Sequence, residues 1–545
     1  MRNINSQLTL IAILLALAIN THAQKRTSFS KVDSIIEAHF EADKPGVAFA
    51  IIQNTETIYQ RTLGLANVEY NIPISDSTLF GIASNSKQMT TFLALMIEAE
   101  GLLSMNDEIA QHLPELKDLP YPITLKQLTN HTHGLPNVDE LAQLKGTERL
   151  THNEIVEMLL GIDEVNFTPG ERQFYSNTGY VLLAEIIERK CNKPFQEVMK
   201  EKFLNPLGMK KSMASNDYLD LIENKAYSYL MGQTGIFTLP PQMGSMGASG
   251  VFSSLNEMTL WANNFYDTQL GKINFYERMK EPTVLNSGEK IEYGMGLQFE
   301  NYKGVDIVFH GGGTDGYRSY LLHAPAHNLS LVFLSNAGGF IGLDVTYGVL
   351  ESLLGGYLEE PKTAFEDLDI STFEGIYELV PGSYTEVRFE NDSLFMNSYG
   401  SPYWDYLERS GNQYFEFAGN DYCKFTFSDE GYQMRYSDMT YTCPKVVRPE
   451  EQMAEDDLNK YIGVYVNETY NVMYRLVLRG NSLVLIEQGQ PKKSLERFSG
   501  NVYYVPFSNF GKLDFEFSEK SEVVGFKLSR QSVEGVTFKK IADCN

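Results

Sequence analysis

Apolar residues in the first two thirds of this chain recur with a helical period in some segments and a strand period in others. Val32, Ile35, Ile36 and Phe40 fall on one helix face, which predicts a helix over residues 31–43. Short apolar runs predict strands over residues 46–53, 57–64, 305–310, 317–323 and 330–334. A closing helix is expected over residues 347–354. Because these strands lie at both ends of a mostly helical middle, we expect an α+β domain over residues 30–358, with one antiparallel sheet, flanking helices and a helical insertion.

After residue 361 the pattern changes to short alternating runs rich in aromatic residues, and these runs repeat once. Residues 373–377 (FEGIY) are echoed by residues 461–465 (YIGVY), and residues 391–394 (NDSL) by residues 480–483 (GNSL). Each repeat is long enough for a small antiparallel barrel, so we expect two all-β, barrel-like domains after the α+β domain. The expected boundaries are 365–445 and 456–545, with an acidic, proline-containing linker over 444–457.

Composition and charge narrow the classes of partner. The 545 residues are 43% hydrophobic and 21% charged, as in ordinary globular proteins of several domains. The formal net charge is −25, and such a surface repels nucleic acid phosphates and anionic lipid headgroups. We therefore expect no nucleic acid partner.

The N-terminus has the pattern of a secretory signal peptide. Arg2 precedes an apolar run over residues 8–19, and the small residue Ala23 follows, which predicts a signal peptide over residues 1–23. A membrane anchor is the alternative, but about twelve apolar residues are too few to cross about 30 Å of hydrocarbon. We expect a periplasmic or secreted bacterial protein with no integral membrane segment after cleavage.

Export permits disulfide bonds, and the chain has four cysteines. Cys423 and Cys443 lie in strand-like sequence and can be paired across neighbouring strands. Four free thiols are the alternative. No cysteine spacing matches a metal site.

The pattern S-x-x-K begins at Ser28, Ser84 and Ser287, and only its context separates the three matches. Ser84 follows an apolar strand-like run and opens an apolar helix, whereas Ser28 follows the leader and Ser287 lies in a turn-like stretch. A serine at a helix N-terminus is favoured as a developing alkoxide by the helix dipole. Lys87, one turn later, lies on the same face, and apolar surroundings would disfavour its charged form and make it a better base. The alternative is a capping serine with a solvated lysine.

Tyr175 and Asn177 form the second candidate pair, ahead of a predicted helix that begins near Gly179. A tyrosine there can pass a proton between the serine and a leaving group. The Asn177 amide both donates and accepts, so it can hold a substrate amide and Lys87 together. A packed aromatic residue in a loop is the alternative for Tyr175. A similar triplet at residues 465–467 lies in the second repeat and lacks the Pro-Gly lead-in.

The third candidate motif is His310 with the glycines after it, at the end of an apolar strand. Glycines there let a backbone approach the substrate closely. An amide within Gly312-Gly313, that of Gly313 being the first choice, would join the Ser84 amide as an oxyanion hole. His310 would line the cleft opposite Lys87. A tight hairpin with an incidental histidine is the alternative.

The order of the three motifs resembles the penicillin-recognising serine hydrolases of the class C β-lactamase type. That group includes D-alanyl-D-alanine peptidases, D-aminopeptidases and esterases. The resemblance covers about residues 30–358 and extends to four further segments, at residues 123–128, 131–136, 205–209 and 250–254. It implies a β-lactamase/transpeptidase-like fold, and it implies a structural role, rather than a zinc site, for His131 and His133.

The chain departs from this family at the third motif. True β-lactamases of this class usually carry Lys-Thr-Gly, where this chain has His310-Gly311-Gly312. The change removes two groups that would hold a β-lactam carboxylate, which argues against efficient antibiotic hydrolysis. Arg318 could replace part of that charge, or be a surface strand residue. The two terminal repeats resemble the paired barrels of D-aminopeptidases, which favours hydrolysis of peptide amides.

We therefore predict an exported serine hydrolase that forms an acyl-enzyme on Ser84 and cleaves amide bonds of D-amino-acid or peptidoglycan-like peptides. Lys87 and Tyr175 would move the proton, and no cofactor or metal is needed. The substrate would be a small molecule or short peptide, with a cell-wall peptide as one candidate. The alternatives are an ester hydrolase or β-lactamase on the same site, a sensor that acylates once and stalls, and a binding protein with a vestigial cleft.

Overall fold

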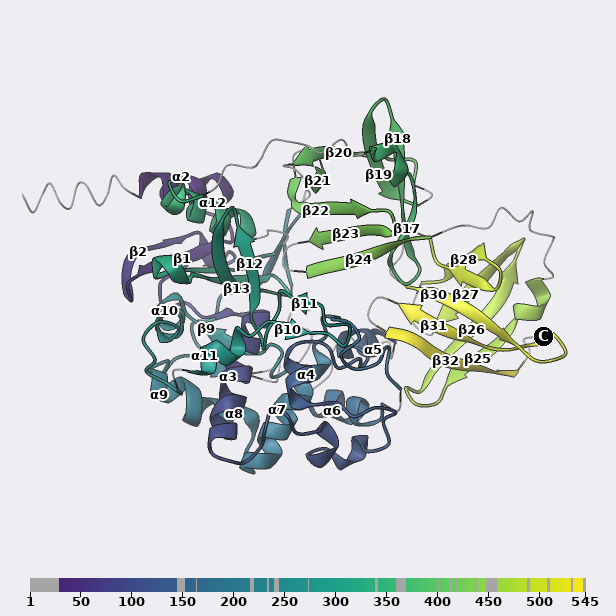
Figure 1. Cartoon of the computed structure of the whole chain (residues 1–545), viewed down its shortest axis with the longest axis horizontal. Helices are drawn as coiled ribbons and strands as arrows, with labels where there is room; N and C mark the ends of the chain where they lie inside the picture. Colours follow the sequence, from purple (N-terminus) through teal and green to yellow (C-terminus); the bar gives the residue numbers. More distant parts are fainter. Residues whose placement is uncertain are drawn as a thin grey trace, which may run out of the picture.

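The computed structural model describes residues 29–542, apart from gaps at 145–151, 163, 216–219, 233–234, 240–244, 273, 339–341, 359–368, 400, 411–413, 418–419, 437–438, 447–457, 488–490, 507–509 and 531–532. The predicted signal peptide and Ser28 lie outside these residues. An α+β domain comes first and two β-barrels follow it, the second of which holds the C-terminal end in Figure 1. Among the described residues, no helix combines the length and apolarity that crossing a membrane requires.

The α+β domain is built on one six-stranded antiparallel sheet assembled from both ends of the segment, as predicted. The strand order is β12-β13-β14-β15-β1-β2, so β1 from the start of the domain pairs with β15 from its end. The strands are β1 (Val47–Gln53), β2 (Glu56–Leu63), β12 (Gln298–Tyr302), β13 (Val305–Thr314), β14 (Tyr317–Ala324) and β15 (Leu329–Ser335). The turn between β1 and β2 uses Asn54 and Thr55 with positive φ angles, which suits a tight hairpin.

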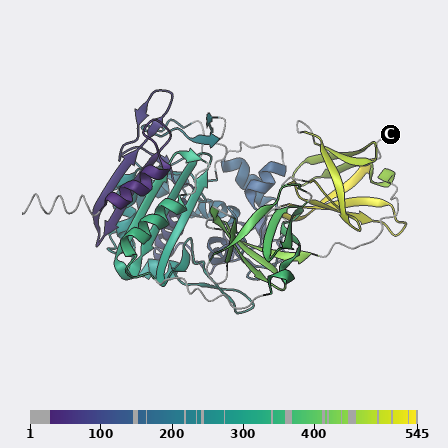
Figure 2. The same ribbon diagram turned by 90° about the horizontal axis from the view of Figure 1, so that it is seen from above.

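Helices cover both faces of this sheet. On one face α2 (Ser30–His39) and α12 (Leu343–Leu354) pack on alternate strand residues such as Phe49 and Phe333, and Figure 2 shows both helices lying across the strands. The opposite residues, such as Ala48 and Ala50, join the larger core of the helical insertion. The first helix ends earlier than its apolar pattern predicted, because Phe40 already has extended backbone while its side chain stays buried.

The insertion contains most of the helices and several short strands. The helices are α3 (Ser86–Ala99), α4 (Leu125–Thr129), α5 (Val138–Leu144), α6 (His152–Leu160), α7 (Thr178–Cys191), α8 (Phe195–Val198), α9 (Asn205–Leu207), α10 (Leu255–Asn264) and α11 (Asn274–Met279). The short strands are β3 (Leu65–Asn67), β4 (Ile72–Pro73), β5 (Phe80–Gly81), β6 (Met213–Ala214), β7 (Tyr229–Gly232), β8 (Gly235–Thr238), β9 (Val251–Ser253), β10 (Thr283–Val284) and β11 (Lys290–Ile291). A further short strand, β16 (Ala337–Gly338), follows β15 and pairs with β7 of the insertion. Phe92 of α3 and Trp261 of α10 meet edge to face near the centre of this core.

Both terminal repeats fold as closed eight-stranded antiparallel barrels, as the sequence repeat predicted. The first comprises β17 (Gly375–Val380), β18 (Ser383–Glu390), β19 (Ser393–Ser398), β20 (Asp405–Ser410), β21 (Tyr414–Phe417), β22 (Asn420–Ser428), β23 (Gly431–Tyr436) and β24 (Met439–Val446). The second comprises β25 (Gly463–Asn467), β26 (Val472–Arg479), β27 (Ser482–Glu487), β28 (Lys493–Ser499), β29 (Val502–Tyr504), β30 (Lys512–Phe517), β31 (Val523–Arg530) and β32 (Val533–Ala542). The repeated glycines, Gly375 and Gly463, begin the first strand of each barrel, so the repeat reflects one architecture used twice.

The second barrel contacts both other parts of the chain. Tyr384 of the first barrel stacks on Phe498 of the second, with ring centroids 3.9 Å apart. Arg530, at the end of β31, reaches Glu140 on α5 of the α+β domain, and α5 lies beside the second barrel in Figure 1. The second barrel therefore packs against both the α+β domain and the first barrel.

Two sequence expectations about the barrels need correction. Cys423 lies on β22 and Cys443 on β24, with β23 between them, and both are free cysteines. The strands that carry them are therefore not neighbours, and the open alternative of free thiols holds for this pair. The predicted linker also begins too early, because residues 444–446 still belong to β24, while residues 447–457 lie outside the described residues. The predicted domain boundaries remain predictions.

Candidate active site

Ser84 lies in a 3₁₀ turn, Ala83–Asn85, between β5 and the start of α3. Ala83 has a φ of 49°, a left-handed conformation that costs a residue with a Cβ atom about 1 kcal/mol. Asn85 donates from Nδ2 to Ser319 Oγ at 2.8 Å, and the Ser319 hydroxyl donates to the Ile82 carbonyl at 2.6 Å. These bonds fasten the turn to β14. Strain that is held in place by its surroundings is common at functional sites.

Lys87 is the fully buried amine next to this serine, with no solvent-exposed surface. Its Nζ lies 3.2 Å from Ser84 Oγ, 2.7 Å from Asn177 Oδ1 and 3.0 Å from the Ala248 carbonyl oxygen. A lysine is rarely buried unless its polar atoms are bonded, and these acceptors meet that need. The amine is therefore held in one position against the hydroxyl.

Asn177 stands at the N-terminus of α7 and is fixed from two sides. Its backbone N–H donates to Asn137 Oδ1 at 3.0 Å, and its Nδ2 donates to Asp139 Oδ2 at 2.6 Å. The second bond turns Oδ1 towards Lys87 and so decides the orientation of the amide. Burial raises the pKa of Asp139, and the bond from Asn177 and the charge of Lys87 offset part of that shift.

Tyr175 covers the amine with its ring. Lys87 Nζ lies 4.9 Å from the centroid of the Tyr175 ring and 5.4 Å from that of Tyr180, both within cation–π range. The His131 ring also packs against Tyr175, with centroids 4.3 Å apart. The amine therefore lies near two aromatic rings, which stabilise the ammonium that forms when Lys87 accepts a proton.

His310 is buried near Tyr175 and does not lie on an open surface. It is fully buried, and its ring centroid is 6.3 Å from that of Tyr175. Burial, with the charge of Lys87 as a second cause, lowers the pKa of His310 to about 3, so the ring is neutral near pH 7. A neutral imidazole brings no positive charge to this part of the site.

Strand β13 continues to Thr314, four residues beyond its predicted end, because the glycines pair with β14. A Cβ atom at Gly312 would lie 2.5 Å from the Ile82 carbonyl oxygen and 3.2 Å from the Ser84 nitrogen, so only glycine fits. Gly313 lies opposite Arg318 in the register, and a Cβ atom there would meet the Arg318 side chain at 3.6 Å. The glycine run therefore approaches the Ser84 turn closely.

Arg318 is partly buried, and its Nη1 donates to the Tyr317 carbonyl at 2.7 Å and to the Asp315 carbonyl at 3.2 Å. The guanidinium is thus folded over the end of β13. The eight predicted site residues form one continuous cluster, and their individual roles remain predictions.

The competing motifs lie elsewhere in different local structure. Ser287 is exposed in the turn between β10 and β11, and its Oγ accepts a bond from the Glu289 backbone N–H at 3.3 Å. Tyr465 is a core residue of the second barrel, where its hydroxyl donates to the Tyr461 carbonyl. Neither environment brings a lysine amine to a serine hydroxyl.

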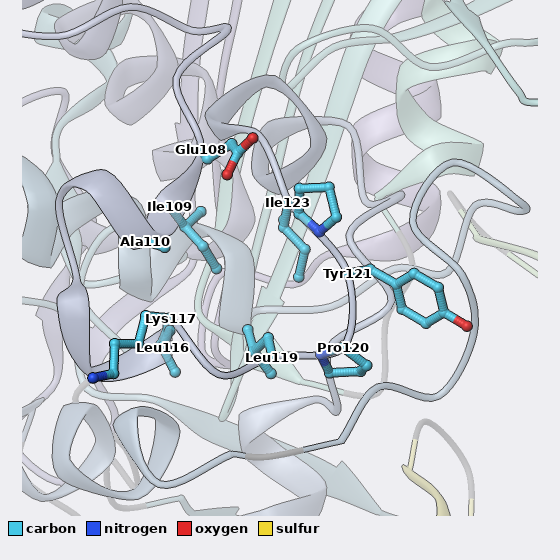
Figure 3. Close-up of a pocket in the computed structure, with 10 residues that line it drawn as sticks. Glu108, Ile109, Ala110, Leu116, Lys117, Leu119, Pro120, Tyr121 and Ile123 are labelled. Carbon is cyan, nitrogen blue, oxygen red and sulfur yellow. The ribbon is translucent and has the colours of Figure 1, made fainter.

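A cavity of about 200 Å³ lies on the segment from Glu108 to Ile123, and Figure 3 shows its lining. The lining is mainly aliphatic, with Glu108, Lys117 and Tyr121 as its ionisable members. It includes no serine, cysteine or histidine and none of the predicted site residues. This cavity is therefore distinct from the Ser84 cluster.

The structure adds partners that the motifs did not reveal. Asp139, the Ala248 carbonyl and Tyr293 each contact a predicted site residue, yet they lie outside the three motifs. Asp139 follows the 131–136 segment by three residues, which was the only signal near it. His131 and His133 are both buried in this region, and the described residues contain no group of three or more metal-ligating side chains.

A comparison with known families decides which family this fold and cluster represent. The family model described as Beta-lactamase matches residues 32–350, more than half of the chain. This chain belongs to the beta-lactamase family. The match covers the domain that holds the Ser84 cluster, and the predicted resemblance to penicillin-recognising serine hydrolases is confirmed. The chain is accordingly a serine hydrolase.

Curated relatives and solved structures agree with this assignment. Penicillin-binding protein 4* of Bacillus subtilis (strain 168) is 28% identical over 408 residues, which are 69% of this chain and 88% of that protein. D-aminopeptidase of Gluconobacter oxydans (strain 621H) is 28% identical over 297 residues, which are 54% of this chain and 56% of that protein.

Among solved structures, the octameric penicillin-binding protein homologue from Pyrococcus abyssi matches 88% of this chain and 98% of its own, with a TM-score of 0.54 and 21% identity. The D-amino acid amidase from Ochrobactrum anthropi SV3 matches 61% of this chain and 99% of its own, with a TM-score of 0.52 and 23% identity. These two likenesses confirm the fold.

Proposed function

We propose that Ser84 is the nucleophile of an exported hydrolase that cleaves amide bonds through an acyl-enzyme. The Ser84 hydroxyl proton passes to the neutral form of the Lys87 amine, directly or through Tyr175, as the Oγ–carbon bond forms. The carbon–nitrogen bond then breaks, and the leaving amine takes that proton. Water attacks the resulting ester, the carbon–Oγ bond breaks, and the serine hydroxyl is restored. No cofactor takes part in these steps.

The observation that carries this proposal is the buried Lys87 amine 3.2 Å from Ser84 Oγ, next to the Tyr175 ring. A proton acceptor must lie within hydrogen-bond reach of the proton that it takes. Asn177 and Asp139 keep the amine there before substrate arrives, which lowers the cost of reaching the reactive geometry. The close approach of Gly312 to the Ser84 nitrogen supports an oxyanion hole made of backbone amides in this region.

Amide substrates with a D-amino acid are the favoured class. Two of the relatives carry the names D-aminopeptidase and D-amino acid amidase. The neutral His310 and the adjacent glycine remove the groups that would hold a β-lactam carboxylate, which argues against efficient antibiotic hydrolysis. Short D-amino-acid peptides, including cell-wall peptides, are therefore the first substrates to test.

The decisive variant is Ser84→Ala, with Ser287→Ala as its matched control in the other described S-x-x-K. We expect Ser84→Ala to lose all measurable turnover with an unchanged thermal unfolding profile, and Ser287→Ala to keep wild-type kcat/KM. Retention of turnover in Ser84→Ala would remove the proposal. Turnover of each variant is measured on a panel of substrates: D-amino-acid amides, D-Ala-D-Ala peptides, p-nitrophenyl esters and nitrocefin.

Ester hydrolysis is the second candidate, because the same serine, amine and amides suit an ester carbonyl equally well. Faster hydrolysis of p-nitrophenyl esters than of every amide would favour it. Intact-mass spectrometry over hours separates both enzymes from a sensor, since only a sensor would keep a stable adduct on Ser84. A binding protein would show neither adduct nor turnover.

Export is proposed from the leader pattern over residues 1–23. Expression of the full chain in a bacterium should yield a mature protein that begins near Gln24 in the periplasmic or extracellular fraction. A retained Met1 on protein recovered from the cytoplasm would contradict it.

A further inference from the structure

His131, Tyr293 and His310 form a buried polar cluster next to Tyr175, and they come from three separate parts of the α+β domain. His131 follows α4, Tyr293 lies between β11 and β12, and His310 lies in β13. The two histidines have no exposed surface, and Tyr293 is 3% exposed. The Tyr293 hydroxyl lies 3.1 Å from Nε2 of each histidine, so it bridges the two rings.

The outer bonds of the cluster fix where its protons lie. His310 Nδ1 is 2.5 Å from the Gly311 carbonyl oxygen, which can only accept, so Nδ1 carries the proton and Nε2 is the acceptor. The Ser176 backbone N–H points at His131 Nδ1 at 3.2 Å and can only donate, so His131 carries its proton on Nε2. The Tyr293 hydroxyl then accepts from His131 and donates to His310.

Both rings are neutral, as this assignment requires. Burial, with the charge of Lys87 as the next cause, lowers the pKa of His131 well below its usual value and that of His310 to about 3. His131 also packs directly on Tyr175, with ring centroids 4.3 Å apart. A rotated or protonated His131 would therefore disturb the ring that faces the Lys87 amine.

We propose that Tyr293 is a positioning residue that bridges the oppositely protonated Nε2 atoms of His131 and His310 and, through the His131 ring, holds the Tyr175 phenol in its place for proton transfer. The last step rests on the proposed function of Tyr175. The tautomers themselves do not depend on it. The Nδ1 bonds select which nitrogen of each ring is protonated, and the Tyr293 hydroxyl then holds both rings at Nε2. Loss of the bridge therefore leaves each ring held at Nδ1 alone.

The test uses Tyr293→Phe in the full chain, with Tyr266→Phe as the matched control. Tyr266 also donates a hydroxyl bond, to the Leu329 carbonyl at 2.8 Å, from a partly buried position outside this cluster. In ¹⁵N-histidine-labelled wild-type protein we expect the His131 proton on Nε2 and the His310 proton on Nδ1. We expect Tyr293→Phe to shift the Nε2 signals of both rings and to lower kcat about 10- to 100-fold, the range found for hydrogen-bond partners that orient metal-ligating histidines, with KM changed less than about 3-fold.

Tyr266→Phe should keep both the histidine signals and kcat of the wild type, even if it lowers the unfolding temperature as much as Tyr293→Phe does. A His310 proton on Nε2 in the wild type, or signals and kcat unchanged in Tyr293→Phe, would overturn the proposal. If Tyr293→Phe does not fold, His131→Asn keeps the acceptor for Ser176 and removes only the Nε2 donor and ring, and the same loss of kcat is expected. If the wild type hydrolyses nothing, the proposed function fails while the tautomer signals still decide the hydrogen-bond bridge.

Discussion

Arg530→Met tests whether the second barrel is locked onto the α+β domain by one buried ion pair. Arg530 donates from Nε to Glu140 Oε2 at 3.1 Å and from Nη2 to Gln143 Oε1 at 2.6 Å. The Arg530 and Glu140 side chains are only 9% and 4% exposed. Methionine keeps most of the length of the arginine side chain and removes only its charge and donors.

The expected cost follows from leaving Glu140 buried without its partner, because breaking one side of a buried pair typically costs about 3–5 kcal/mol. Burial already raises the pKa of Glu140 to about 7, with Arg530 opposing that rise and neighbouring Asp139 adding to it. Below that pH the carboxyl takes up a proton, which relieves the unpaired charge. The loss of stability should therefore be larger at about pH 8.5 than at about pH 6.

Differential scanning calorimetry of the full chain measures this cost, and a loss of about 3–5 kcal/mol corresponds to roughly 6–15 °C for a domain of this size. Lys527→Met is the control, since Lys527 lies in β31 like Arg530 and pairs with Glu516 at 3.7 Å, but its side chain is 52% exposed. A loss of stability of about 1 kcal/mol or less is expected for it. Glu140→Met combined with Arg530→Met should recover most of the loss, because two apolar side chains replace the pair. An Arg530→Met cost equal to that of the control, or single losses that simply add, would refute the reasoning.

Three further outcomes are expected. Gly312→Ala puts a methyl group 2.5 Å from a backbone oxygen, so kcat/KM should fall at least about 100-fold, whereas Gly356→Ala, which points into open space, should leave it unchanged. Burial lowers the pKa of His323 to about 3, so the stability gained from its neutral ring is present above about pH 6.5 and lost as the pH falls towards 3. In that window, His323→Asn should reduce the slope of the unfolding free energy against pH, measured with urea, by about 1.4 kcal/mol per pH unit. Cys423 and Cys443 should be alkylated only after unfolding, and a peptide in which they are linked would contradict the structure.

Much of the fold could be predicted because its signals are local. The apolar run before Ser84 and the apolar helix after it distinguished this S-x-x-K from the exposed turn at Ser287. The paired glycines, Gly375 and Gly463, marked the same strand in two barrels. Element ends were less predictable, because Phe40 stays buried after α2 has ended and the glycines after His310 remain paired in β13.

The partners of the site residues could not be predicted in the same way. Lys87 and Asn177 are 90 residues apart, Asn177 and Asp139 are 38 apart, and His131 and Tyr293 are 162 apart. Side-chain periodicity reports which face of its own element a residue occupies, and it carries no information on which distant side chain will meet that face.

By itself the sequence determined the sheet built from both ends, the repeated barrels and the order of the three motifs. Those features depend on hydrophobic burial and backbone preference, which short stretches of chain already express. Only the tertiary structure decided that Asp139 orients Asn177, that His310 is neutral and buried, and that Arg530 joins the second barrel to α5. These properties arise from desolvation and hydrogen bonds between distant segments, and they exist only once the helices and the sheet have packed together.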